Sequence, residues 1–140
     1  MIPEWVLILI GLGGGLIGGI ILYFLSTEES KTGKQYFLSI QIMVFSIMIV
    51  VGIFSLASQS KYWLLVGSIV IGLITLILHW NYTQWWTGLL MLVFGAGYMV
   101  LFQDETIRMS IVSLLFILGL PTGTLLMVEH DNKKQKKRSR

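Results

Sequence analysis

The chain has 140 residues, 55% of them hydrophobic and only 12% charged, whereas a soluble domain carries about 25% charged residues. It has no cysteine, which excludes disulfides, thiolate metal sites and cysteine nucleophiles. The formal charge of +3 does not describe a basic surface, because six of the ten lysines and arginines lie in the last eight positions.

Five apolar runs without Asp, Glu, Lys or Arg follow one another: Trp5–Leu25, Tyr36–Ala57, Tyr62–Trp80, Trp85–Phe102 and Met109–Val128. Each has about the length that a helix needs to cross a hydrocarbon core of roughly 30 Å. We therefore predict an all-α fold, a polytopic transmembrane helical bundle of about five spans. The third and fourth runs are separated only by "NYTQ", so a re-entrant segment in place of one full span stays open.

The first run contains "ILIGLGGGLIGGIIL", in which glycines recur at four-residue spacing. Residues four apart share one side of a helix, and small residues let another helix approach closely in a bilayer. The predicted packing face, a glycine zipper, consists of Gly11, Gly14, Gly15, Gly18 and Gly19. The sequence leaves open whether the contact lies within the chain or between chains. The start "MIPEW" lacks a basic segment, so we expect an uncleaved anchor rather than a signal peptide.

The second run holds Gln41, the only side-chain amide within a predicted span. It offers both a strong donor and a strong acceptor, so it should face protein rather than lipid. With Ser39 and Ser46 it forms a candidate polar lining. Ordinary contacts between helices are the favoured interpretation, and a polar conduction path is the alternative.

Ionisable groups that could carry catalysis are scarce in the predicted spans. His79 lies at the end of its run beside Trp80 and is expected to be a membrane-edge residue rather than a proton switch. The "EHD" segment, Glu129–His130–Asp131, has the residue types of a metal site, but three adjacent residues at a helix end do not converge on one point. We therefore expect no enzyme activity, no metal and no cofactor.

The last run carries Pro121 between Gly119 and Gly123. A proline inside a helix removes one backbone hydrogen bond and kinks the helix. The pattern predicts a kink here, fixed by packing or, alternatively, acting as a hinge.

After the transmembrane domain, residues 1–128, we expect a basic cytoplasmic tail, residues 129–140, to be disordered. Its basic residues are Lys133, Lys134, Lys136, Lys137, Arg138 and Arg140. Five spans place eight basic residues on the side of the tail and two on the other, so the N-terminus should be outside and the C-terminus inside. The tail is expected to contact anionic lipid headgroups, with docking to a protein as the alternative, and not to bind nucleic acid.

Together these features predict a small integral protein of the cytoplasmic membrane, of bacterial type. The favoured function is a non-enzymatic accessory, assembly or regulatory subunit, packing through its glycine-rich first helix against itself or a larger membrane complex. The alternative is a small homo-oligomeric channel or transporter for ions or small solutes.

Overall fold

The structure is a computed structural model that describes residues 3–81, 85–102 and 104–138. Within these ranges the chain forms helices and no strand. The first apolar run is α1 (Glu4–Leu9), a π-helical turn η1 (Ile10–Gly14) and α2 (Gly15–Leu25), and a short helix α3 (Thr27–Thr32) follows. The other helices are α4 (Lys34–Ser58), α5 (Tyr62–Asn81), α6 (Trp85–Leu101) and α7 (Glu105–Arg138).

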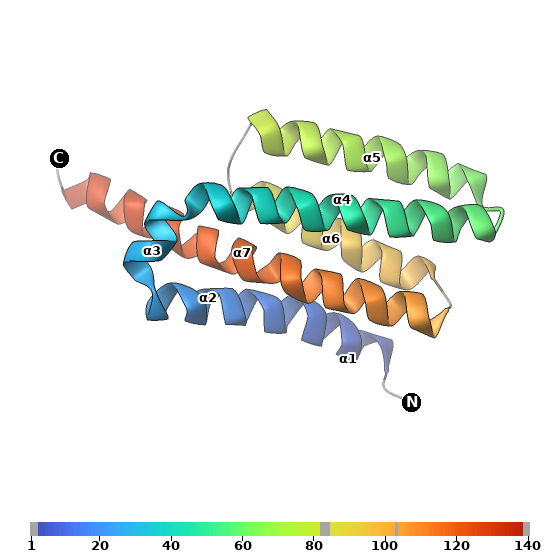
Figure 1. Ribbon diagram of the computed structural model, residues 1–140, viewed down its shortest axis with the longest axis horizontal. Helices are drawn as coiled ribbons and strands as arrows, with labels where there is room; N and C mark the ends of the chain where they lie inside the picture. The colour runs from blue at the N-terminus through green and yellow to red at the C-terminus, as the bar shows by residue number, and fades with distance from the viewer. Residues whose placement is uncertain (1–2, 82–84, 103, 139–140) are drawn as a thin grey trace.

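The long helices lie side by side and run alternately in opposite directions, with the two chain ends at opposite ends of the bundle (Figure 1). α7 occupies the centre, because α2, α4 and α6 all pack against it, whereas α5 packs against α4 and α6. The apolar window of α7 is 56% buried, compared with 17% for the first helix and 22% for α5. The other helices are therefore arranged around α7.

Among the described residues, four helices are long and apolar enough to cross a membrane, namely Trp5–Leu25, Lys34–Ser58, Tyr62–His79 and Glu105–Lys137. The apolar helix Trp86–Leu101 is shorter, so the fifth span and the orientation stay predictions. The outer surface carries many large apolar side chains, including Trp63, which is 93% exposed, and Phe54, which is 73% exposed. Exposed large apolar side chains occur on α2, α4, α5, α6 and α7. So many of them are unusual for a soluble monomer, and with the apolar helices they indicate a membrane protein.

The core lies between α4, α6 and α7. Phe45 and Met48 of α4, Met91 of α6, and Leu115 and Leu118 of α7 are all fully buried. A chain of aromatic contacts runs along α6, in which the Phe94 ring lies edge-on to Phe45 at 5.5 Å and to Tyr98 at 4.9 Å.

At the start of α7, Asp104 satisfies backbone groups that a helix leaves without partners. Its Oδ1 accepts from the N–H groups of Thr106 at 2.8 Å and Ile107 at 3.3 Å. This is an N-cap in the usual sense, and it fixes where the central helix begins.

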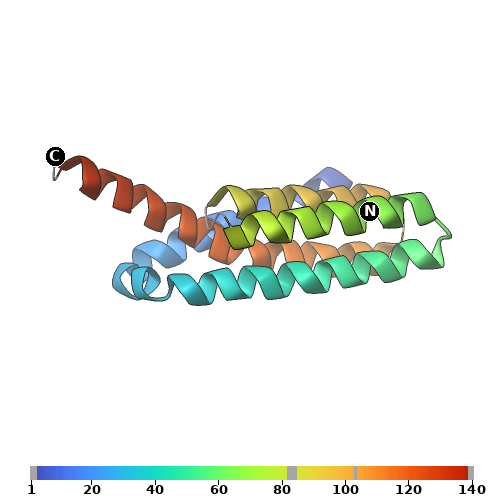
Figure 2. The ribbon, with the colours of Figure 1, turned by 90° about the horizontal axis from the view of Figure 1, so that it is seen from above.

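At its other end, α7 continues through Arg138, where the sequence led us to expect a disordered tail from residue 129. The helix is already formed in the apolar part, so each further residue adds a hydrogen bond without a new nucleation step. Glu129 and Lys133 also form an ion pair of 3.1 Å at a spacing of four residues, which supports a helix. In Figure 2 the C-terminal part of α7, drawn in red, leaves the bundle at an angle to the part drawn in orange.

Candidate functional sites

The glycines of the first helix lie against α7 of the same chain. A Cβ atom built on Gly15 would lie 2.5 Å from the carbonyl oxygen of Phe116 and 3.0 Å from the Cα of Gly119. One built on Gly19 would lie 3.0 Å from the Cα of Gly123. Even a methyl group does not fit at these positions, so the two backbones can touch only because both helices carry glycine there.

The two glycine strips of the first helix have different neighbours on α7. Gly11, like Gly15 and Gly19, is buried and faces backbone, with a built Cβ 3.3 Å from the carbonyl oxygen of Val112. Gly14 and Gly18 face the side chains of Phe116 and Leu120 instead, at 3.1 Å and 2.8 Å. We call the contact of these five glycines with α7 the glycine seam.

A π-helical turn lies at the start of the seam, over Ile10–Gly14. In a regular α-helix a step of four residues overshoots one turn of 3.6, so a row at this spacing drifts around the helix. A π-helical turn, with its i→i+5 hydrogen bonds, contains more residues per turn than an α-helical turn, and this offsets the drift of the glycine row. Gly11 consequently stays on the same side as Gly15 and Gly19, all three of which are buried.

Gly119 and Gly123, expected to take part in a kink, are the α7 side of the seam. Pro121 between them is buried inside the helix. The hydroxyl of Thr124 lies 2.9 Å from the carbonyl oxygen of Gly19 and 3.0 Å from that of Leu120, so it bridges the two helices where they are closest.

A second candidate site is a polar cluster inside the bundle, at the end nearest the C-terminus. The Gln41 Nε2 of α4 donates to Thr122 Oγ1 of α7 at 2.8 Å, and the Thr122 hydroxyl donates to the Leu118 carbonyl at 2.8 Å. Both side chains are at most 1% exposed. Gly88 of α6 lies directly against this hydrogen bond. A Cβ atom at this position would lie 2.6 Å from Gln41 Nε2 and 2.9 Å from Thr122 Oγ1, so there is room only for glycine.

His79 of α5 belongs to the same region. Its Nδ1 lies 2.7 Å from the Oγ1 of Thr87, the residue before Gly88, and the ring approaches the backbone of Leu38, one turn before Gln41. His79 is 1% exposed, so its side chain faces the interior of the bundle, because α6 folds back along α5 and brings Thr87 to the ring. It lies in the last turn of α5, and its place at the membrane edge stays a prediction.

Two atoms of this cluster, Gln41 Oε1 and His79 Nε2, are buried and have no hydrogen-bond partner in the part of the chain that the structure describes. A buried polar group without a partner is uncommon in native proteins. The buried polar cluster (Gln41, His79, Thr87, Gly88 and Thr122) therefore has unused hydrogen-bonding capacity in the interior.

The other residues of the predicted polar lining do not join Gln41. Ser39 is exposed and donates to the carbonyl of Gln35 at 3.0 Å. Ser46 donates to the carbonyl of Ile42 at 2.8 Å and lines a hollow together with residues of α5. Both hydroxyls bond back to their own helix, as hydroxyls in apolar helices commonly do.

The "EHD" residues point in three directions. Glu129 pairs with Lys133, and Asp131 accepts a hydrogen bond from the Tyr23 hydroxyl of α2. His130 is exposed and lines a hollow with Lys133, Lys134, Lys136 and Lys137. Among the residues that the structure describes, no group of three His, Cys, Asp or Glu side chains could hold a metal ion.

The third candidate site is this hollow at the C-terminal end of α7, an open space of about 580 Å³. Its lysines belong to the part of α7 that extends past the other helices (Figure 2). Of the remaining predicted tail residues, Arg140 lies outside the described residues, and Arg138 is the last residue of the helix.

Comparison with protein families, with curated proteins and with solved structures finds no match.

Proposed function

We propose that this chain is a non-enzymatic accessory, assembly or regulatory subunit of a larger assembly in the cytoplasmic membrane. The observation that carries the proposal is the double use of α7. Its apolar part is the centre of the bundle, packed by α2, α4 and α6. Its last turns, residues 129–138 with the exposed Lys133, Lys134, Lys136 and Lys137, form what we call the basic arm. One continuous helix thus links the membrane part to the polar side.

The glycine seam refines this proposal. The face that the sequence offers for helix packing is filled by α7, so the bundle is closed without a second chain. A partner in the membrane then docks on the outer surface, which is apolar on α5 at Val66, Val70 and Ile74.

Photo-crosslinking in native membranes tests the proposal. A photoreactive amino acid at the outward positions Val66 and Ile74 should give a discrete adduct with another membrane protein. The same group at the buried Leu115 is the matched control and should give adducts within the chain alone. Outward positions that crosslink only to lipid, together with a chain that purifies alone, would overturn the proposal.

A second candidate, a small channel or transporter, is favoured by one observation, the buried polar cluster with its unpartnered Gln41 Oε1 and His79 Nε2. Buried polar groups in membrane helices often mark substrate or ion paths. Flux of ions or small solutes through proteoliposomes, abolished by Gln41→Leu and retained in the outward variant Ile74→Leu, would favour this candidate. If no flux is seen with a pH gradient of either direction across the proteoliposome membrane, the channel or transporter candidate is excluded.

A further inference from the structure

Four basic residues share one side of the basic arm. At 3.6 residues per turn, His130, Lys133, Lys134 and Lys137 fall within an arc of about 100°. Glu129 and Asp131 lie about 100° to either side of His130. Asp131 is directed to the Tyr23 hydroxyl on α2. The carboxylates thus flank the basic side.

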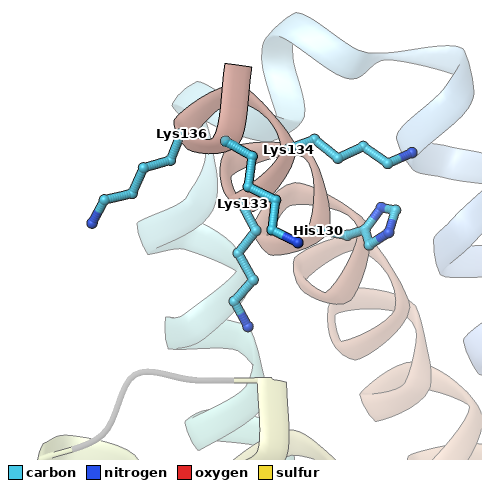
Figure 3. Close-up of a pocket in the computed structure, with 5 residues that line it drawn as sticks. His130, Lys133, Lys134 and Lys136 are labelled. Atoms are coloured by element: carbon cyan, nitrogen blue, oxygen red, sulfur yellow. The ribbon is translucent and has the colours of Figure 1, made fainter. Parts of the chain in front are cut away.

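The side chains support this division. In Figure 3 His130 and Lys134 point to the same side of α7, Lys133 points toward the bundle, and Lys136 points the opposite way from Lys134. His130, Lys133, Lys134 and Lys137 are all exposed. We call these four residues the basic face.

The carboxylate nearest to the basic face is that of Glu129, 3.1 Å from Lys133 Nζ. This pair is exposed on the lysine side, where the side chain is 68% accessible. Exposed pairs of this kind are weak, so Lys133 can exchange the carboxylate for a phosphate.

The basic face begins at the depth of the headgroup layer of a membrane. The Gln41–Thr122 bond aligns antiparallel α4 and α7 so that Lys34, the first residue of α4, is level with Glu129. The apolar region therefore ends near Val128. The headgroup region is about 5–8 Å thick on each side of the hydrocarbon core. Along the helix from Val128, His130 and Lys133 lie at about 3 Å and 7–8 Å, within this layer, whereas Lys134 and Lys137 lie at about 9 Å and 14 Å, at and beyond its outer edge.

We propose that the basic face binds the phosphates of anionic phospholipid headgroups, and that it does so as one side of an ordered helix rather than as a disordered charged tail. This inference depends on the membrane placement of the proposed function. Lysine ammonium groups attract the phosphate charge, and a ring N–H of His130 can donate to a phosphate oxygen. Contact with lipid would fix the arm at the membrane surface.

The absence of cysteine makes a direct test practical. In the full-length chain, Gln135→Cys places one thiol on the arm, about 140° away from His130, for an environment-sensitive fluorophore. The labelled protein is reconstituted in nanodiscs of phosphatidylcholine alone or with increasing phosphatidylglycerol. We expect phosphatidylglycerol to change the fluorescence with a defined midpoint composition.

Variants that each remove one positive charge decide whether the affinity for phosphatidylglycerol comes from the basic face or from the net charge of the arm. Lys134→Gln and Lys137→Gln should each weaken the apparent affinity for phosphatidylglycerol about fivefold. Lys136→Gln removes the same charge from the opposite flank and should change it less than twofold. Equal losses in all three variants would overturn the proposal of a specific face.

Two further results would also overturn it. One is the same fluorescence in both lipid compositions. The other is an equal response when inorganic phosphate is added to phosphatidylcholine nanodiscs, which would assign the face to a soluble phosphate compound. None of these outcomes depends on recovering a protein partner, so failure here is distinguishable from failure of the proposed function.

Discussion

At the scale of single residues, the bundle depends on positions where no side chain fits. Gly15 and Gly19 meet the backbone of α7, and Gly88 meets two hydrogen-bonded side chains. In lipid, apolar side chains gain little by leaving their surroundings, so close packing of this kind supplies much of the stability.

The seam predicts a contrast between glycines of the same helix. Gly15→Ala should destabilise the bundle by about 1–3 kcal/mol, the usual cost of overpacking, because its Cβ meets the Phe116 carbonyl. Gly13 has nothing within 4 Å of a built Cβ, so Gly13→Ala should leave stability unchanged or raise it by up to about 1 kcal/mol. Thermal unfolding in detergent, followed by circular dichroism, measures both. Equal effects of the two substitutions would show that α7 does not lie against this face.

The polar cluster predicts a dependence between two residues on different helices. Gly88→Ala should cost about 1–3 kcal/mol, since its Cβ would lie 2.6 Å from Gln41 Nε2. In a Gln41→Ala background most of that cost should disappear, because the obstructing amide is gone. A double-mutant cycle on unfolding free energies measures this coupling. Strict additivity would contradict the contact.

At the scale of elements, α7 is the helix on which the other parts depend. Asp104 starts it, the glycine seam and the polar cluster pack on its middle, and the hydroxyl of Tyr23 holds Asp131 near its end. Pro121 lies within the buried part of α7, seven residues before Val128, near which the apolar region ends. A change in this helix is therefore expected to move the basic face relative to the bundle.

Pro121→Ala should straighten α7, because alanine restores the missing backbone donor. Proline kinks commonly exceed about 20°. Over the roughly 21 Å from residue 121 to residue 135, loss of such a bend moves the arm by about 7 Å. Electron paramagnetic resonance distances between labels at Glu28→Cys on α3 and Gln135→Cys measure the movement. The lipid-facing variant Ile117→Ala is the control and should leave the distance distribution in place. No shift in Pro121→Ala would mean that packing alone sets the bend.

At the scale of the whole molecule, hydropathy predicts the apolar helices, but neither α3 (Thr27–Thr32) nor the full extent of α7 (Glu105–Arg138). The apolar runs predicted at 62–80 and 85–102 agree with α5, Tyr62–Asn81, and α6, Trp85–Leu101, to within one residue. The all-helical fold and the membrane class follow from run length and from the lack of charges.

The contacts between helices could not be predicted in the same way. These helices are apolar on all sides, so no polar face shows which side is buried. The partner of the glycine face, the burial of His79 by Thr87 and the place of Gly88 all depend on residues distant in the sequence. The helical arm was missed because its composition suggests a solvated tail, and nothing local shows that a formed helix leads into it.

The predicted arrangement in the membrane has an odd number of crossings, with the basic arm inside. Two single-cysteine variants of the full-length chain, Pro3→Cys and Gln135→Cys, test this with a membrane-impermeant thiol reagent applied to intact cells. We predict that the thiol at position 3 is labelled at once and that the thiol at position 135 is labelled only after permeabilisation. Labelling of both thiols from the same side would contradict the five-span arrangement and the membrane placement of the basic face.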